Sequence, residues 1–275
     1  MSSSTYEREL EVALDLAKQA GAVIAEAFDQ AKHVDTKSTS VDLVTSTDKE
    51  CERVILGGLR EAFPSHSFIG EESHEGGGFS IGSEPTWVVD PVDGTNNFVH
   101  AFPFVCVCIG LLVDKQPVLG VVYNPVIDEL YVAVKGQGAT CNGKRIRVSQ
   151  CASIRQAIVS TEFGYDRTAQ GVAEMTGHVS RLLTAQIRGV RSLGSCAMNV
   201  CSVARGRLDA FFEGKNESFG PKPWDMVAAA IILTEAGGVM RDWQGGELDI
   251  TSGRIMAANS PQLADEIIAC LGGNS

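Results

Sequence analysis

The sequence has no long apolar run, and its first residues lack the composition of a secretion signal. No stretch of the 275 residues approaches the roughly 18 consecutive apolar residues that a membrane-spanning helix needs. The N-terminal segment has no basic start, and acidic residues such as Glu7, Glu11 and Asp15 interrupt its apolar positions, which is unlike a signal peptide. We therefore expect a cytoplasmic protein that does not interact with membranes.

Positive charge is also scarce. The chain has 23 basic and 34 acidic side chains, which gives a net charge of −11. This balance argues against a nucleic-acid partner, because phosphate backbones attract surfaces rich in lysine and arginine. Taken alone, it also argues against an anionic ligand such as a phosphorylated metabolite. The hydrophobic fraction of 44% is that of an ordinary globular protein.

Several motifs of known chemistry are missing. The sequence contains neither G-x-x-x-x-G-K-[ST] nor H-E-x-x-H, and its five histidines are isolated, so we expect neither a P-loop nor a zinc site. The eight cysteines have no C-x-x-C spacing. Cys106 and Cys108 alternate within an apolar run, which predicts packed, reduced thiols.

One cysteine has the C-x5-R spacing of cysteine-dependent phosphatases. Cys141 is followed by Arg147, but Thr140 precedes it where those enzymes carry a histidine. The dipeptide Asn142-Gly143 is a strong tight-turn signal. We therefore interpret this segment as a hairpin.

The order of predicted elements divides the chain into two halves. In the front half, about residues 1–150, helical periodicity covers 5–28, and Thr47 with Glu50 predicts a capping box for a second helix ended by Pro64. Short apolar runs then predict strands at 67–70, 86–90, 105–113, 118–123, 130–134 and 146–148, with a hairpin at 114–117. In the back half, about 151–275, strands at 157–161, 188–192 and 208–213 alternate with helices near 169–185, 195–206, 225–236 and 260–271.

Acidic residues gather where two predicted strands end. Glu71 follows the strand at 67–70, and Asp90 and Asp93 run into a Gly94-Thr95 turn. Carboxylates in such proximity repel one another unless a cation lies between them, and oxygen ligands suit Mg²⁺. Gly94-Thr95 begins a predicted helical turn whose free N–H groups form a seat for phosphate. These are the parts of two-metal phosphoryl hydrolysis.

Two other interpretations of this segment are open. Asp-x-Asp-Gly-Thr marks phosphatases that form an aspartyl phosphate, but here Asp90 and Asp93 are one residue further apart, and Pro91 is predicted to break the strand between them. A covalent intermediate is therefore disfavoured. The two aspartates could also merely cap a turn, because Asp, Pro and Gly are common turn residues.

Longer segments carry a resemblance to a known family. WVVDPVDGTNNFVHAFP and PWDMVAAAIILTEAGG, together with the segment from Asp42 to Asp48, resemble the inositol monophosphatase family of lithium-sensitive, Mg²⁺-dependent phosphomonoesterases. The resemblance extends from the first helix to the C-terminus. It implies an α+β fold of the fructose-1,6-bisphosphatase type, an αβαβα layered sandwich. It also implies a single domain over 1–275 and a homodimer.

The resemblance also assigns metal ligands and catalytic residues. Two or three Mg²⁺ ions are implied, the first held by Glu71, Asp90 and the carbonyl of Val92, and a third sharing Glu71. The second ion is held by Asp90, Asp93 and Asp225. The catalytic residues are Asp48, Thr95 and Glu71, of which Thr95 and Asp48 orient and deprotonate the attacking water. The substrate is met by Asp93, Gly94, Thr95, Gly194, Ser195, Cys196, Glu213 and Asp225.

The sequence departs from the family pattern at two places. The segment between Glu213 and Asp225 is several residues longer than in the animal enzymes, and Asn96 replaces a threonine. Two roles stay open: Lys37 belongs either to a loop near the metals or to the solvated surface, and Arg191 either orients Glu213 or stabilises a subunit interface.

We therefore expect a Mg²⁺-dependent enzyme that hydrolyses myo-inositol monophosphate to myo-inositol and inorganic phosphate by metal-activated water, and that lithium inhibits. The first alternative is the same chemistry on another small phosphate ester, namely fructose 1,6-bisphosphate, a sugar 1-phosphate, histidinol phosphate or a nucleotide bisphosphate. The second is a non-catalytic metal- or phosphate-binding homologue. Retention of Glu71, Asp90, Asp93, Thr95 and Asp225 argues against the second.

Overall fold

The computed structural model describes residues 6–30, 32, 34–36, 43–74, 76, 79 and 81–273. Its helices are α1 (Glu7–Ala27), α2 (Ser46–Ala62), α3 (Thr95–Val99), α4 (Ala169–Thr184), α5 (Cys196–Ala204), α6 (Pro223–Glu235) and α7 (Pro261–Leu271), with a 3₁₀ turn at Ile154–Gln156. Both long N-terminal helices are amphipathic. The buried residues of α1, such as Ala13, Ala17 and Ile24, recur at helical spacing on one face.

The front half forms a seven-stranded sheet in the order β3-β4-β5-β6-β7-β8-β9. Its strands are β3 (Ser67–Gly70), β4 (Thr86–Asp93), β5 (Cys106–Val113), β6 (Gln116–Asn124), β7 (Glu129–Val134), β8 (Ala139–Cys141) and β9 (Lys144–Arg145). Every neighbouring pair is antiparallel except β3 and β4, which run parallel. The carboxyl ends of β3 and β4 therefore lie at the same edge of the sheet.

The back half forms a five-stranded mixed sheet in the order β11-β10-β12-β14-β13. Its strands are β10 (Ile158–Thr161), β11 (Gly189–Arg191), β12 (Ala210–Glu213), β13 (Val239–Arg241) and β14 (Ile255–Ala258). A separate antiparallel pair joins β1 (Val34–Thr36) and β2 (Leu43–Thr45).

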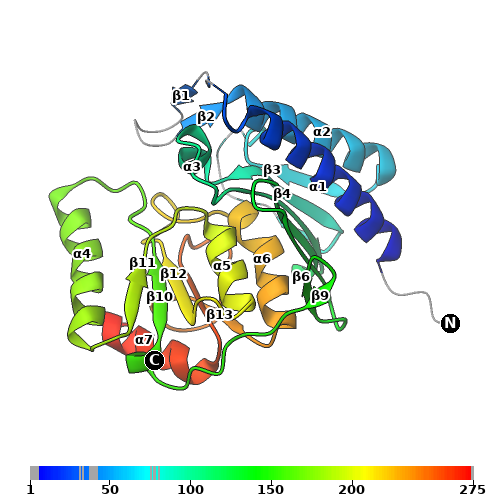
Figure 1. Ribbon diagram of the computed structural model, residues 1–275. Coiled ribbons are helices and arrows are strands. Elements are labelled where there is room, and N and C mark those ends of the chain that lie inside the picture. The colour runs from blue at the N-terminus through cyan, green and yellow to red at the C-terminus, as the bar shows by residue number, and fades with distance from the viewer. Residues whose placement is uncertain are drawn as a thin grey trace.

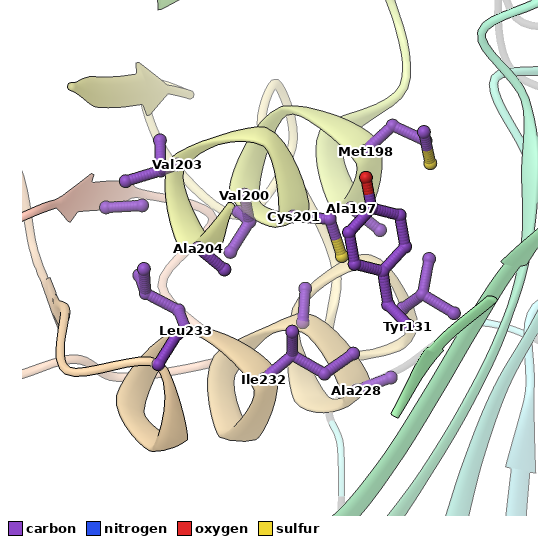
Figure 2. Close-up of a cluster of buried hydrophobic side chains, with 14 of the residues drawn as sticks. Tyr131, Ala197, Met198, Val200, Cys201, Val203, Ala204, Ala228, Ile232 and Leu233 are labelled. Atoms are coloured by element: carbon purple, nitrogen blue, oxygen red, sulfur yellow. The ribbon is translucent and has the colours of Figure 1, made fainter. Parts of the chain in front are cut away.

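Figure 1 shows five layers. Helices α1 and α2 cover the outer face of the large sheet, α5 and α6 lie between the two sheets, and α4 and α7 cover the outer face of the small sheet. Figure 2 shows the middle layer, in which Tyr131 of β7 packs against side chains of α5 and α6 such as Met198 and Ile232. This confirms the αβαβα arrangement.

Glycines bring α6 against the large sheet. A Cβ atom at Gly120 of β6 would lie 2.3 Å from the carbonyl oxygen of Ala228, and one at Gly110 of β5 would lie 2.9 Å from the backbone nitrogen of Ala228. Real Cβ atoms do not approach backbone this closely. The position of α6, which begins two residues before Asp225, therefore depends on the absence of side chains at these two positions.

Some sequence predictions for local structure were wrong. The capping box of α2 is formed by Thr45 and Asp48 rather than by Thr47 and Glu50. The helix therefore begins earlier than the predicted box implies. Residues 146–148 are not a strand. Pro91 does not end β4, which continues to Asp93 through a shift of register. The strands β13 and β14 were not predicted.

The Asn142-Gly143 turn is confirmed. Asn142 and Gly143 have φ angles of 50° and 73° and join β8 to β9, as a two-residue hairpin requires. All eight cysteines are free thiols. Among the described residues, no helix combines the length and the apolar character required to cross a membrane.

Candidate active site

Three aspartates from distant parts of the chain meet at the end of β4. Asp90 and Asp93 lie on β4, Asp225 lies on the first turn of α6, and one carboxylate oxygen of each falls within 4.8 Å of the others. Asp90 pairs with Cys108 and Asp93 with Cys106 across the ladder, so β4 has one extra residue between the pairs. This bulge, at Pro91, allows two residues with an odd spacing to point to the same side.

The electrostatics of this cluster are unfavourable without a cation. Burial raises the pKa of Asp90 well above its usual value, and the charges of Glu71, Asp93 and Asp225 raise it further. Burial, with the charges of Asp93 and Glu71, also raises the pKa of Asp225 to about 8. The ligand atoms that Asp90, Asp93 and Asp225 bring together are all carboxylate oxygens, which fit a hard divalent cation such as Mg²⁺.

Asp93 is held in place by the beginning of α5. Its Oδ2 accepts hydrogen bonds from Ser195 Oγ at 2.6 Å and from the N–H of Ala197 at 2.6 Å, and its Oδ1 accepts one from the N–H of Cys196 at 3.2 Å. Burial raises the pKa of Asp93, although these three donors act in the opposite direction. The back half of the chain thus orients a carboxylate that belongs to the front sheet.

Asp48 and Thr95 are in contact, as predicted. Thr95 Oγ1 lies 3.1 Å from Asp48 Oδ1 and 3.1 Å from the carbonyl oxygen of Val92. The other oxygen of Asp48 accepts hydrogen bonds from the N–H and hydroxyl of Thr45, at 2.9 and 2.5 Å. A hydroxyl beside a fixed carboxylate is an arrangement that can relay a proton from water.

Glu71 and Val92 complete the predicted metal ligands. Glu71 follows β3, its N–H donates to the carbonyl of Val89 at 3.2 Å, and its charge raises the pKa of both Asp90 and Asp225. The N–H of Val92 donates to Asp90 Oδ1 at 2.9 Å. Val92 therefore fixes the Asp90 carboxylate, while its carbonyl oxygen lies beside the Thr95 hydroxyl.

Gly94 precedes the short helix α3 and has a φ of 96°. A Cβ atom there would lie 2.9 Å from the carbonyl oxygen of Phe104 and 3.3 Å from Ser195 Cβ. Both the backbone conformation and the space require glycine at this position.

Glu213 ends β12 and contains an unpaired buried atom. Its Oε2 finds no hydrogen-bond donor in the part of the chain that the structure describes. Burial raises the pKa of Glu213 well above its usual value, and the charges of Glu162, Asp225 and Asp93 raise it further. A buried carboxylate oxygen without a donor is costly, so this atom is a candidate acceptor for a ligand hydroxyl.

Two backbone N–H groups of the predicted substrate-binding segment 194–196 already donate hydrogen bonds within the protein. The N–H of Gly194 donates to Glu162 at 3.0 Å, and the N–H of Cys196 donates to Asp93. A ligand at this segment would therefore have to compete with Glu162 and Asp93 for these two N–H groups.

The longer segment after Glu213 packs against α4. Lys215 Nζ lies 3.2 Å from Asp166 Oδ2 and 3.1 Å from Glu174 Oε2. Lys215, Glu162 and Glu213 are among the residues that line a cavity of about 30 Å³. The cavity has room for about one water molecule.

Two remaining predictions have different outcomes. Arg191 is exposed and its Nη1 donates to the carbonyl of Val190 at 2.9 Å. Arg191 was proposed to pair with Glu213, but it is not among the charged residues that shift the pKa of Glu213. Lys37 and Asp42 lie outside the described residues.

Sequence reasoning missed Glu162 and Asn97. Glu162 directly follows β10 and accepts hydrogen bonds from the 192–194 segment, and Asn97 donates to Leu193 from the other side. A charged residue at the end of an apolar strand was a usable signal for Glu162. The partners of both residues are distant in sequence, which no local pattern indicates.

Comparisons with known proteins agree with this geometry. The sequence profile of the inositol monophosphatase family matches residues 5–273. Inositol monophosphatase 2 of Solanum lycopersicum is 49% identical over 267 residues, covering 96% of this chain and 98% of its own. Human inositol monophosphatase 1 is 45% identical, covering 94% and 92%. The solved structure of an inositol monophosphatase from Anabaena (Nostoc) sp. PCC 7120 superposes with a TM-score of 0.82 at 35% identity, covering 98% and 97%. This chain therefore belongs to the inositol monophosphatase family.

Proposed function

We propose that this protein hydrolyses myo-inositol monophosphate to myo-inositol and inorganic phosphate in a Mg²⁺-dependent reaction. The observation that carries the proposal is the convergence of Asp90, Asp93 and Asp225 beside the Thr95–Asp48 pair. The names of the relatives, at 45% to 49% identity over nearly the whole chain, support the choice of substrate.

The proposed metal ligands are Glu71, Asp90, Asp93, Asp225 and the carbonyl of Val92. When bound, two or three Mg²⁺ ions would lower the pKa of a water molecule and stabilise the departing alkoxide. The mutual repulsion of the buried carboxylates supports a site for cations rather than a structural acidic cluster.

The chain's own residues have distinct tasks in this proposal. Asp48 accepts a proton through the Thr95 hydroxyl, since its Oδ1 is directed at that hydroxyl and its Oδ2 is held by Thr45. Glu71 is the third catalytic residue of the proposal. The N–H groups of Gly94 and Thr95 bind the phosphate.

The polyol contacts that we propose are Asp93, Asp225, Glu213 and the segment Gly194, Ser195 and Cys196. Glu213 is the acceptor with the strongest support, because its buried Oε2 needs a donor and an inositol hydroxyl supplies one.

Phosphate release from a substrate panel tests the proposal. Inositol 1-phosphate, fructose 1,6-bisphosphate, histidinol phosphate and adenosine bisphosphate would be compared at equal Mg²⁺. We expect the inositol ester to have the highest kcat/KM, and no release after chelation of the metal. A higher kcat/KM for another ester would contradict the substrate assignment and leave the metal site standing.

Rapid quenching with labelled substrate tests direct attack by water. Asp90 is engaged by Val92 and lies among other carboxylates, so we expect no phosphoenzyme. Trapping a phosphoryl group on Asp90 would restore the aspartyl-phosphate alternative.

Three finer features belong to the same proposal: a homodimer, a cytoplasmic location and inhibition by lithium. Light scattering of the purified protein, microscopy of a fluorescent fusion and phosphate release in the presence of LiCl would test them separately.

A further inference from the structure

The segment Ser192–Ser195 connects β11 to α5, and the carboxylate of Glu162 binds it from one side. Glu162 Oε1 accepts hydrogen bonds from the N–H of Leu193 at 2.9 Å and of Gly194 at 3.0 Å. Glu162 Oε2 accepts one from Ser192 Oγ at 2.8 Å. Asn199 of α5 also donates to Oε1, at 2.9 Å. Four donors therefore converge on this single side chain.

Asn97 of α3 binds the same segment from the other side. Asn97 Nδ2 donates to the carbonyl of Leu193 at 2.7 Å and to the carbonyl of Phe104 at 2.9 Å. Gly194 has a φ of 109°, and a Cβ atom there would lie 2.1 Å from Asn97 Nδ2. The amide of Asn97 thus lies directly against the backbone of Gly194.

The last residue of this segment is the one that fixes Asp93. Ser195 Oγ lies 2.6 Å from Asp93 Oδ2 and also accepts a hydrogen bond from the N–H of Met198 at 3.1 Å, which caps α5. A displacement of Leu193 and Gly194 would therefore move the hydroxyl and the helix terminus that orient Asp93.

The chemistry of Glu162 suits this task specifically. Burial raises its pKa, although the hydrogen bonds from Gly194, Leu193, Ser192 and Asn199 act in the opposite direction. All four of these partners are donors, so a carboxylate satisfies them all. A glutamine would keep the three bonds to one oxygen, but without the negative charge that strengthens them, and its –NH₂ group would reverse the direction of the bond with Ser192.

We propose that Glu162 and Asn97 form a two-sided clamp on Leu193–Gly194, and that this clamp positions Asp93 for metal binding. They are positioning residues, because they act through Ser195 and α5 rather than on the reacting atoms. This inference rests on the proposed metal-dependent function. It adds two residues that are not metal ligands but that influence metal affinity.

Glu235 offers a matched control. Its carboxylate likewise anchors a loop through two backbone N–H groups, those of Gly136 at 2.7 Å and Gly138 at 2.6 Å, but at the opposite end of α6 from Asp225. Glu235→Gln therefore reproduces the loss of a loop anchor without touching the clamp.

The experiment compares Glu162→Gln, Asn97→Ala and Glu235→Gln with the unaltered protein. Mg²⁺ affinity of the metal-free protein would be measured by calorimetry, and the half-saturating Mg²⁺ by phosphate release. Residues that orient metal ligands typically affect metal affinity by about 10- to 100-fold. We expect a loss of about tenfold in Asn97→Ala, a smaller loss in Glu162→Gln, and none in Glu235→Gln.

Thermal unfolding separates positioning from stability. If the clamp only stabilises the fold, all three variants would lower Tm and none would change Mg²⁺ affinity, which would overturn the proposal. Asn97→Ala removes two hydrogen bonds from a half-buried side chain, so it keeps the test valid if Glu162→Gln does not fold.

The double variant Asn97→Ala/Glu162→Gln gives a second criterion. Because both residues bind the peptide group that joins Leu193 to Gly194, the loss of Mg²⁺ affinity in the double variant should be smaller than the product of the single losses. Independent, multiplicative losses would contradict a shared clamp. If inositol 1-phosphate is not hydrolysed but the Mg²⁺ losses appear, the proposed substrate fails and the clamp stands.

Discussion

Asp48 and Asp225 occupy equivalent positions in two different helices. Each is the third residue of its helix, and each uses one oxygen to accept a hydrogen bond from the N–H three residues earlier, that of Thr45 or Lys222. The remaining oxygen of Asp48 is directed at Thr95, and the carboxylate of Asp225 shares a hydrogen bond with Asp90. Helix capping therefore fixes two functional carboxylates while serving the fold.

The role of the Thr95 hydroxyl can be tested by an isosteric change. Thr95→Val keeps the shape of the side chain but removes the group that lies between Val92 and Asp48. We expect kcat to fall by about 100-fold or more with little change in KM. Thr95→Ser should recover most of the activity, and a valine variant with near-original kcat would exclude proton relay by Thr95.

Asp90 lies among several other acidic groups, so its charge is the most informative to remove. Asp90→Asn should abolish Mg²⁺-dependent phosphate release, and it should raise the Tm of the metal-free protein because one buried charge is lost. Asp114→Asn is the matched control, since Asp114 has a φ of 50° in an exposed turn that asparagine tolerates. Near-full activity of Asp90→Asn would refute the metal assignment.

At the scale of elements, the close contact between α6 and the large sheet makes Gly120 critical. Gly120→Ala would press a methyl group against the Ala228 carbonyl. We expect a loss of about 1–3 kcal/mol in unfolding free energy and weaker Mg²⁺ binding, because α6 carries Asp225.

Gly57→Ala serves as the comparison for Gly120→Ala. Gly57 lies within α2, and no heavy atom lies within 4 Å of the position that a Cβ atom would take there. Alanine at this position should therefore stabilise the protein by up to about 1 kcal/mol. Equal effects of the two substitutions on stability would show that α6 can shift freely against the sheet.

The positions of most elements could be predicted from periodicity, but some boundaries could not. The box of Thr47 and Glu50 satisfies the same local rule as that of Thr45 and Asp48, and only the contact of Asp48 with Thr95 distinguishes them. Strands β13 and β14 were missed, although they are as long as β11 and β12, which were predicted. The proposed metal ligands were assigned from motifs and the family resemblance, whereas the hydrogen-bond partners of Glu162 lie 30 to 37 positions away.

At the scale of the whole molecule, a carboxylate network ties the front sheet to the middle layer. Glu129 of β7 accepts hydrogen bonds from Arg205, Arg207 and Tyr131, at 2.5 to 2.8 Å. Burial raises the pKa of Glu129, but the hydrogen bonds from Arg207 and Tyr131 and the charges of both arginines outweigh it, so the pKa is lowered.

This lowered pKa predicts a pH-dependent stability. The charged form is favoured in the folded state, so Glu129 stabilises the protein above its unfolded pKa of 4.5 and loses that effect as pH falls through the lower folded pKa. The difference in unfolding free energy between the original protein and Glu129→Gln should be constant from about pH 6 to 8 and shrink below pH 4.5.

Denaturant unfolding at several pH values would measure this difference. Glu50→Gln is the control, because Glu50 forms an exposed pair with Arg53 that the solvent screens. A Glu129→Gln effect that grows as pH falls would show that the network is not held by the carboxylate.

In the folded molecule, the excess of 11 negative charges is not spread evenly over the chain. Several of the carboxylates converge on one site, where bound cations would offset them, so the overall charge does not oppose an anionic substrate there.

The order of strands also affects when this protein becomes active during its synthesis. Strand β14 is made after the other strands of the small sheet, pairs with β12, the strand that ends in Glu213, and lies inside that sheet. Asp225 likewise emerges from the ribosome long after Asp90. A nascent or prematurely terminated chain that ends before residue 255 therefore has the front sheet's acidic residues but cannot close the back sheet. Phosphatase activity should appear only after β14 has been synthesised, and products truncated before this strand should have none.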